Sequence, residues 1–190
     1  MNILLSICLG MGLSAACGFR VFVPLLAMSI ASLSGHLTLS HGFQWIGTYS
    51  AFIAFGTATI LEVAAYYVPW FDNLMDSIAA PAAMIAGTLV AASSIVQMDS
   101  MMKWALAIIA GGGTAAIFHG ATTIMRGAST AVTGGLGNHA IATTELGIAS
   151  GLSALAITLP LVCGVVVLVL LFIVTRKGFQ KLSKRSGGRA

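Results

Sequence analysis

The sequence predicts an all-α membrane protein, a polytopic bundle of five to six transmembrane helices. Of its 190 residues, 58% are hydrophobic and 7% are charged, whereas soluble domains average about half and about a quarter. Apolar stretches long enough to cross a bilayer recur along the chain, and residues 176–190 carry six basic side chains and no acidic one. A soluble protein with so few charges would expose large apolar patches, so the composition favours a surface that faces lipid.

The first apolar stretch, residues 3–33, is longer than the roughly 20 residues that a straight helix needs to cross a bilayer. It contains three glycines and Pro24. Glycine and proline are common causes of kinks and breaks in membrane helices. We therefore expect a broken or steeply tilted helix here, followed by a polar loop at 34–48.

The remaining spans follow in order, separated by turn signals. Tyr66, Tyr67 and Trp70 are typical of a turn at a membrane interface, and the glycines of residues 134–138 exclude a helix there. Pro160 is a candidate kink in the last stretch. The expected helical segments are residues 49–67, 77–97, 104–133, a short helix at 140–151 and a full span at 152–174.

Two halves of the predicted transmembrane domain, residues 1–98 and 103–175, have a similar plan. Each begins with a glycine-bearing stretch that holds one arginine, continues with a glutamate in an apolar helix, and ends in a proline-bearing span. These residues are Arg20, Glu62 and Pro81 in the first half, and Arg126, Glu145 and Pro160 in the second. If three spans precede the second half, the halves have opposite orientations, which is the inverted-repeat plan common in transporters.

The basic segment 176–190 predicts the orientation of the protein. Positive charge beside a membrane span favours the cytoplasmic side and lipid headgroups as the partner, rather than nucleic acid. We therefore expect an inner-membrane protein with a cytoplasmic C-terminus. With six spans Met1 is cytoplasmic too, and with five it lies outside.

Three segments carry a resemblance to a known family. They are GFRVFVPL at 18–25, the run from Glu62 through Pro69 to Asp76, and GGLGN at 134–138 followed by Glu145. Together they resemble the bacterial membrane-protein family called domain of unknown function 4126 (DUF4126). His139 stands where the family often has a proline, and no basic residue precedes Pro69. The resemblance implies a polytopic membrane protein and no particular activity.

The charges within apolar stretches are the main candidates for a substrate or ion site. A charge at the bilayer centre costs about 2.5–3.5 kcal/mol, so we expect Arg20 to pair with Glu62 and Arg126 with Glu145. Asn138 belongs to the same predicted site, because it ends the glycine-rich run that could line a cavity. The pairs could equally be structural pins between helices.

Further candidates are weaker, and each has a structural alternative. Asp72 and Asp76 could share a helix face or cap a helix, and His119 could relay protons or bind a ligand. Gly135 and Gly137 could let the backbone approach a ligand. The sequence has no metal-ligand spacing, cofactor motif or enzyme signature, so we expect no metal site, no cofactor and no enzymatic activity.

These features predict a transporter or channel for a small ion or anionic solute, with a site near the membrane midplane between two inverted halves. Two other functions stay open. One is a translocase or binder of a phosphorylated lipid, with the arginines on the phosphate. The other is a membrane scaffold that transports nothing. The expected partners are membrane lipids and a small ion or solute, and the sequence leaves homo-oligomerisation undecided.

Overall fold

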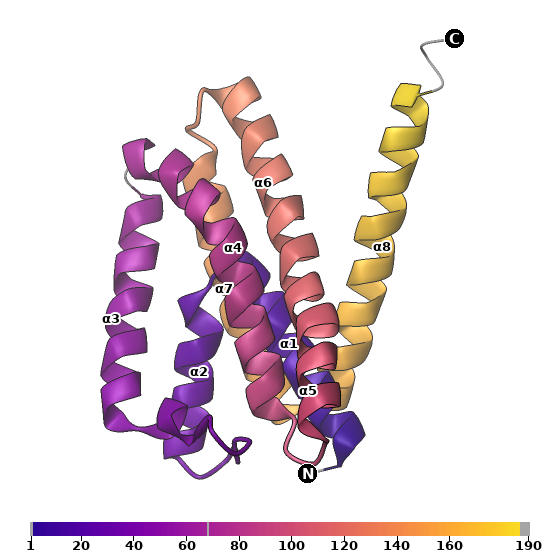
Figure 1. Cartoon of the computed structure of the whole chain (residues 1–190). Coiled ribbons are helices and arrows are strands. Elements are labelled where there is room, and N and C mark those ends of the chain that lie inside the picture. Colours follow the sequence, from indigo (N-terminus) through magenta and orange to yellow (C-terminus); the bar gives the residue numbers. More distant parts are fainter. Residues whose placement is uncertain (1, 68, 187–190) are drawn as a thin grey trace.

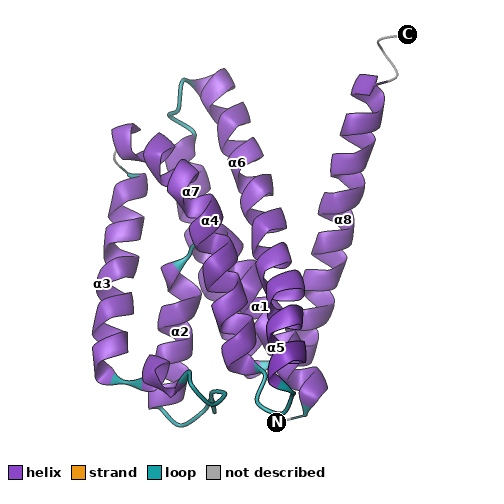
Figure 2. Ribbon diagram, viewed as in Figure 1, coloured by secondary structure: helices purple, strands orange, loops and turns teal. Residues whose placement is uncertain are grey.

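A computed structural model of the protein describes residues 2–67 and 69–186, without the side chains of residues 69–77, 178–179 and 181–186. All regular elements in that part of the chain are helices, as predicted (Figure 2). They are α1 (Ile3–Phe19), α2 (Phe22–Leu33), the 3-10 turn η1 (Gln44–Gly47), α3 (Tyr49–Tyr66), α4 (Pro69–Ser94), α5 (Ser100–Leu106), the π-helical segment η2 (Ala107–Gly112), α6 (Gly113–Thr133), α7 (Asn138–Thr158) and α8 (Pro160–Ser186).

The first apolar stretch is a helical hairpin. Arg20 has extended backbone angles, φ −143° and ψ 125°, and ends α1. Pro24 falls in the first turn of α2, where a missing N–H leaves no helical hydrogen bond unmade. Figure 1 shows α1 entering the bundle and α2 returning to the end from which α1 came. The predicted break is confirmed, and Arg20 and Val21, which form the link between the two helices, are both buried.

From α3 onwards the helices alternate in direction, so that the start of α1 and the end of α8 lie at opposite ends of the bundle (Figure 1). In the described residues, four helical segments are long and apolar enough to cross a membrane: Tyr49–Tyr66, Ser100–Thr133, Asn138–Thr158 and Pro160–Lys177. Three shorter apolar segments are Ile3–Phe19, Phe22–Leu33 and Ile78–Ser94. The chain is therefore a membrane-type helical bundle.

The last apolar stretch divides at a different point from the one expected. A break near Gly151 was predicted, but α7 continues to Thr158 and α8 begins at Pro160. Proline disfavours a helical conformation in the residue before it, and Leu159 has φ −133° and ψ 66°. Proline is also well suited to the first position of a helix, so Pro160 separates two helices and does not kink one.

The core of the bundle is built on α1, which packs against α4, α6, α7 and α8. Small residues allow close approach, as in other membrane helix pairs. A Cβ atom at Gly12 would lie 2.6 Å from the sulfur of Cys163, and one at Gly87 would lie 2.9 Å from the carbonyl oxygen of Gly111. The buried Ser14 hydroxyl donates to the Gly87 carbonyl at 2.7 Å, which fixes α1 to α4 where both meet η2.

Candidate functional site

Four charged side chains are buried in the described part of the bundle, and they lie around the tip of the hairpin. They are Arg20 at the tip, Glu62 on α3, Arg126 on α6 and Glu145 on α7, with exposed fractions of 1%, 7%, 3% and 3%. They are separated by up to 125 positions in the sequence. The fold thus brings the four charged residues that we singled out in the sequence into one place, which we call the charge cluster.

Glu145 is the centre of the charge cluster because it contacts both arginines. Arg126 donates from Nε to Oε1 at 3.1 Å and from Nη2 to Oε2, which is a bidentate geometry. Arg20 places Nη2 3.6 Å from Oε2 of the same carboxylate and donates to the carbonyl of Ala142 at 2.9 Å. The predicted pair of Arg126 and Glu145 is therefore present.

The predicted pair of Arg20 and Glu62 is replaced by another contact. The backbone N–H groups of Val21 and Phe22 donate to the two carboxylate oxygens of Glu62, at 2.7 Å and 3.1 Å. A helix N-terminus carries unpaired N–H groups and a partial positive charge, and in a membrane interior no water satisfies them. Glu62 therefore caps α2, and the ion-pair partner of Arg20 is Glu145 instead.

Tyr66 completes the cluster, and its position differs from the one that the sequence predicted. It was expected in an interfacial belt, but only 5% of it is exposed. Its ring lies 4.0 Å from the guanidinium carbon of Arg20 and 4.0 Å from that of Arg126, so both cations contact an aromatic face. The signal for this role was present in the sequence, because Tyr66 follows Glu62 by four residues and shares its helix face.

Asn138 is buried at the start of α7, and its side-chain nitrogen donates to Thr130 on α6 at 3.0 Å. Gly134 and Gly135 have positive φ, 63° and 95°, which turns the chain between α6 and α7 at one end of the bundle (Figure 1). The Gly135 carbonyl accepts from the N–H of Asn138, and the N–H of Gly137 donates to Thr133. These backbone groups form hydrogen bonds within the turn itself. None of the three glycines lines a described pocket.

Several buried side chains, among them Arg20, Ser29 and His119, have polar atoms without a hydrogen-bond partner among the residues described. In Arg20 these are Nε and Nη1, and in His119 the atom is Nε2. His119 shares a buried face of α6 with Arg126. The side chains of Asp72 and Asp76 lie outside the described residues. In the described part of the chain, His, Cys, Asp and Glu form no group of three or more that could hold a metal ion.

Among the described residues, two pockets border the charge cluster from different sides. One, of about 200 Å³, lies between α6 and α7 and includes Glu145, Thr122 and Thr144 in its wall. The other, of about 530 Å³, lies between α2, α3 and α4 and includes Glu62 and Tyr66. The other lining residues of both pockets are apolar. A ligand that reaches the cluster by either route passes mainly apolar side chains.

Comparison with known proteins identifies a family for the chain. A family model described as Domain of unknown function (DUF4126) matches residues 7–178. Neither a curated protein nor a solved structure matches the chain. The family match spans every residue of the charge cluster, including the segments in which the resemblance was seen. The chain therefore belongs to the DUF4126 family.

Proposed function

We propose that this protein is a transporter or channel for a small ion or anionic solute, with its substrate site at the charge cluster. The observation that carries the proposal is the state of Arg20, whose side chain is 1% exposed and whose Nε and Nη1 have no partner among the described residues. Unsatisfied donors of a buried cation cost free energy. An anionic oxygen at these nitrogens would remove that cost.

The rest of the cluster supports an exchange of partners during transport. Glu145 contacts Arg20 less closely than it contacts Arg126, so the Arg20 contact is the one that an anion can replace. Glu62 and Glu145 provide sites for protons or cations. The Arg20–Val21 link is a break between two helices, as in transporters that bind substrates at discontinuous helices.

We also infer an arrangement in the membrane. Helices α3, α4, α5–α6, α7 and α8 form five crossings, and the α1–α2 hairpin enters and leaves on one side. The basic C-terminal segment is on the cytoplasmic side of a bacterial inner membrane, which puts the start of α1 outside. The directions of α3 and α4 are opposite to those of α7 and α8, as two inverted halves at 1–98 and 103–175 would require, whereas α1 and α6 run in the same direction (Figure 1).

The first test is ion flux in proteoliposomes with chloride, inorganic phosphate and succinate as separate probes. Arg20→Gln should lower the flux of the transported anion by about tenfold to a hundredfold, because a hydrogen bond to a charged group contributes about 1.5–3 kcal/mol. Lys103→Gln is the matched control, since Lys103 contacts Ser40 on the loop after α2 and lies outside the cluster. Equal flux in wild type and Arg20→Gln for every probe would contradict the proposal.

A membrane scaffold is the second candidate, favoured by the dense contacts of the cluster between α3, α6, α7 and the hairpin. In that case wild type shows no flux above empty liposomes, and Arg20→Gln only lowers the melting temperature in detergent. A translocase or binder of a phosphorylated lipid is the third candidate, favoured by the apolar walls of the pockets beside the cluster. A scrambling assay with a fluorescent phosphatidic acid distinguishes it from transport of a small solute.

A further inference from the structure

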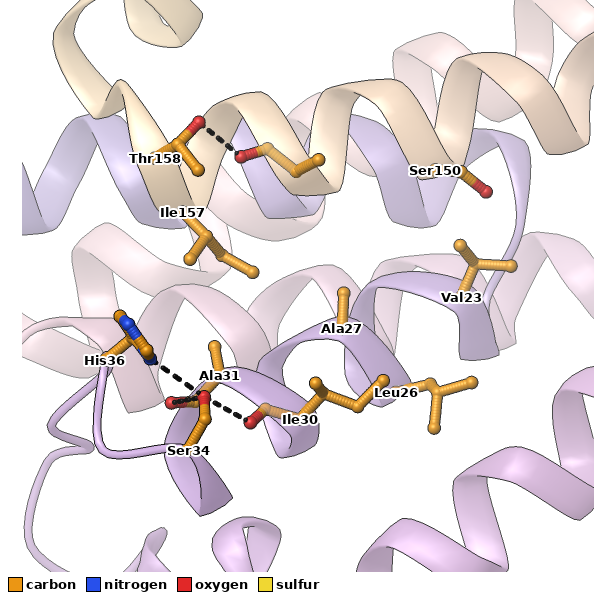
Figure 3. Close-up of a pocket in the computed structure, with 11 residues that line it drawn as sticks. Val23, Leu26, Ala27, Ile30, Ala31, Ser34, His36, Ser150, Ile157 and Thr158 are labelled. Atoms are coloured by element: carbon orange, nitrogen blue, oxygen red, sulfur yellow. Dashed lines mark hydrogen bonds between the residues drawn. The ribbon is translucent and has the colours of Figure 1, made fainter.

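The largest groove described in the structure lies between α2 and α7 and has a volume of about 700 Å³. Figure 3 shows that the two helices run along its two sides. Its walls are mainly apolar side chains, from Val23, Leu26, Ala27 and Ile30 on α2 and from Ala154 and Ile157 on α7. Such a wall offers few groups that could replace the hydration shell of an ion, so the groove suits a hydrocarbon chain.

The inner end of the groove is close to the charge cluster. Figure 3 shows Val23 and Ser150 together at this end. Val23 follows Arg20 by three residues, and Ser150 follows Glu145 by five, so each is only one or two helical turns from the cluster. Arg20 does not itself line the groove, and its hydrogen bond to the Ala142 carbonyl joins the tip of the hairpin to α7.

The outer end of the groove has different chemistry. It is formed by Ser34, His36 and Thr158 (Figure 3), and the His36 ring contacts the Ser34 hydroxyl at 3.0 Å. The loop at 34–48 contains no lysine and no arginine. An anionic group is therefore better placed toward the inner end, because Arg20, three residues before Val23, has two nitrogens without a hydrogen-bond partner among the described residues.

We propose that the substrate is a single-chain amphiphilic anion whose hydrocarbon chain lies in the α2–α7 groove and whose carboxylate or phosphate head binds Arg20. This inference rests on the proposed transport function and names its substrate class. From Val23 to Ile30 the groove follows α2 for about 10 Å at 1.5 Å per residue. A medium-length acyl chain lying along it would exchange a lipid environment for an apolar protein wall, while its head gains the donors of Arg20.

Photolabelling tests the proposal directly. The probe is decanoate with a diazirine at the end of its chain, added to the full-length protein in liposomes, and the adducts are mapped by mass spectrometry. Adducts should concentrate on residues 26–30 and 154–158. Unlabelled decanoate and decyl phosphate should compete, and the stronger of the two identifies the head. Acetate and inorganic phosphate should compete at least about tenfold less well, since they bury no CH₂ groups.

Variants separate the parts of the site. Ala27→Phe and Ala154→Phe fill the groove and should lower the labelling about tenfold or more, and Arg20→Gln should lower it similarly by removing the partner of the head. Ala131→Phe, at an exposed position of α6, should label like wild type. Melting temperatures in detergent show whether each variant is folded, and a double variant with Ala27→Gly and Ala154→Gly, which widens the groove, should still be labelled.

Several outcomes would overturn the inference. These are equal competition by acetate and decanoate, adducts spread over all lipid-facing helices, or full labelling of a folded Arg20→Gln variant. If acetate or phosphate competes equally and is also transported, the transport function stands and the substrate class is wrong. If labelling is specific but no anion is transported, the binding site stands and the transport function is wrong.

Discussion

At the scale of single residues, the charge cluster is a set of opposite charges that pair with one another away from water, while Nε and Nη1 of Arg20 have no hydrogen-bond partner among the described residues. Two arginines share Glu145 and the ring of Tyr66, while Glu62 binds the first N–H groups of α2. A charge in the membrane is tolerated only when such contacts offset its loss of hydration. Removing one charged side chain should therefore lower the stability of the protein more than removing both members of an oppositely charged pair.

Glu145→Gln leaves both arginines without their carboxylate. We expect the free energy of unfolding to fall by about 3–5 kcal/mol, the usual cost of breaking a buried ion pair on one side. The double variant with Arg126→Gln should recover much of this loss, since it removes one of the two stranded cations. The measurement is denaturant unfolding in detergent, followed by circular dichroism.

Thr144→Ala is the control for this series, because Thr144 precedes Glu145 and is exposed. It should change the free energy of unfolding by no more than about 0.5 kcal/mol. A double variant as unstable as the sum of the single variants would show that Glu145 and Arg126 act independently, against the geometry of the pair.

At the scale of elements, some helices of the bundle pack closely because glycine, which has no side chain, lies at their contacts. The closest approach is between α4 and η2, where a Cβ atom on Gly111 would lie 2.6 Å from the Gly87 carbonyl oxygen and 2.6 Å from the Ala91 side chain. The π-helical segment at 107–112 places Gly111 against α4. Neighbouring Gly113 has open space where its Cβ would be.

This difference gives a matched pair of substitutions two residues apart. Gly111→Ala should destabilise the protein by about 1–3 kcal/mol, because the added methyl group overlaps the backbone of α4. Gly113→Ala should be neutral or stabilising by up to about 1 kcal/mol, since alanine is the better helix former. Thermal melts in detergent measure both, and equal destabilisation would mean that α4 and η2 do not approach as closely as described.

At the scale of the whole molecule, the hairpin α1–α2 decides which loops share an end of the bundle. The loop at 34–48 and the α4–α5 connection at 95–99 lie at the end of the bundle where α1 starts (Figure 1). The turn between α6 and α7 lies at the other end. A single broken span from 3 to 33 would instead put the loop at 34–48 on the side opposite to the start of α1.

Labelling of single cysteines with a membrane-impermeant maleimide tests this arrangement in intact cells. His41→Cys and Gln97→Cys should be labelled from outside, and Leu136→Cys should be labelled only after the membrane is opened. Leu136 is 82% exposed, so access to its side is not limited by the protein. A Cys8→Ser background removes the partly exposed native thiol. Labelling of Leu136→Cys in intact cells would contradict the proposed orientation.

The sequence by itself determined the class of the fold and the list of charged residues in the candidate site. Long apolar stretches can satisfy their backbone in lipid only as helices, and breaks at proline and glycine follow from local geometry. A break within residues 3–33 and a turn near 134–138 were therefore predictable. These properties depend on residue type and on neighbours close in the chain.

The tertiary structure alone decided how those residues are combined. Nothing in the sequence distinguishes a broken span from a hairpin, and only the hairpin presents the N–H groups of Val21 and Phe22 to Glu62. Because Glu62 makes that contact, both arginines contact Glu145 instead. The ring of Tyr66 contacts both guanidinium groups. Partner choice depends on which helices pack together, and packing is set by the fit of whole helix surfaces, which the local pattern of residues does not specify.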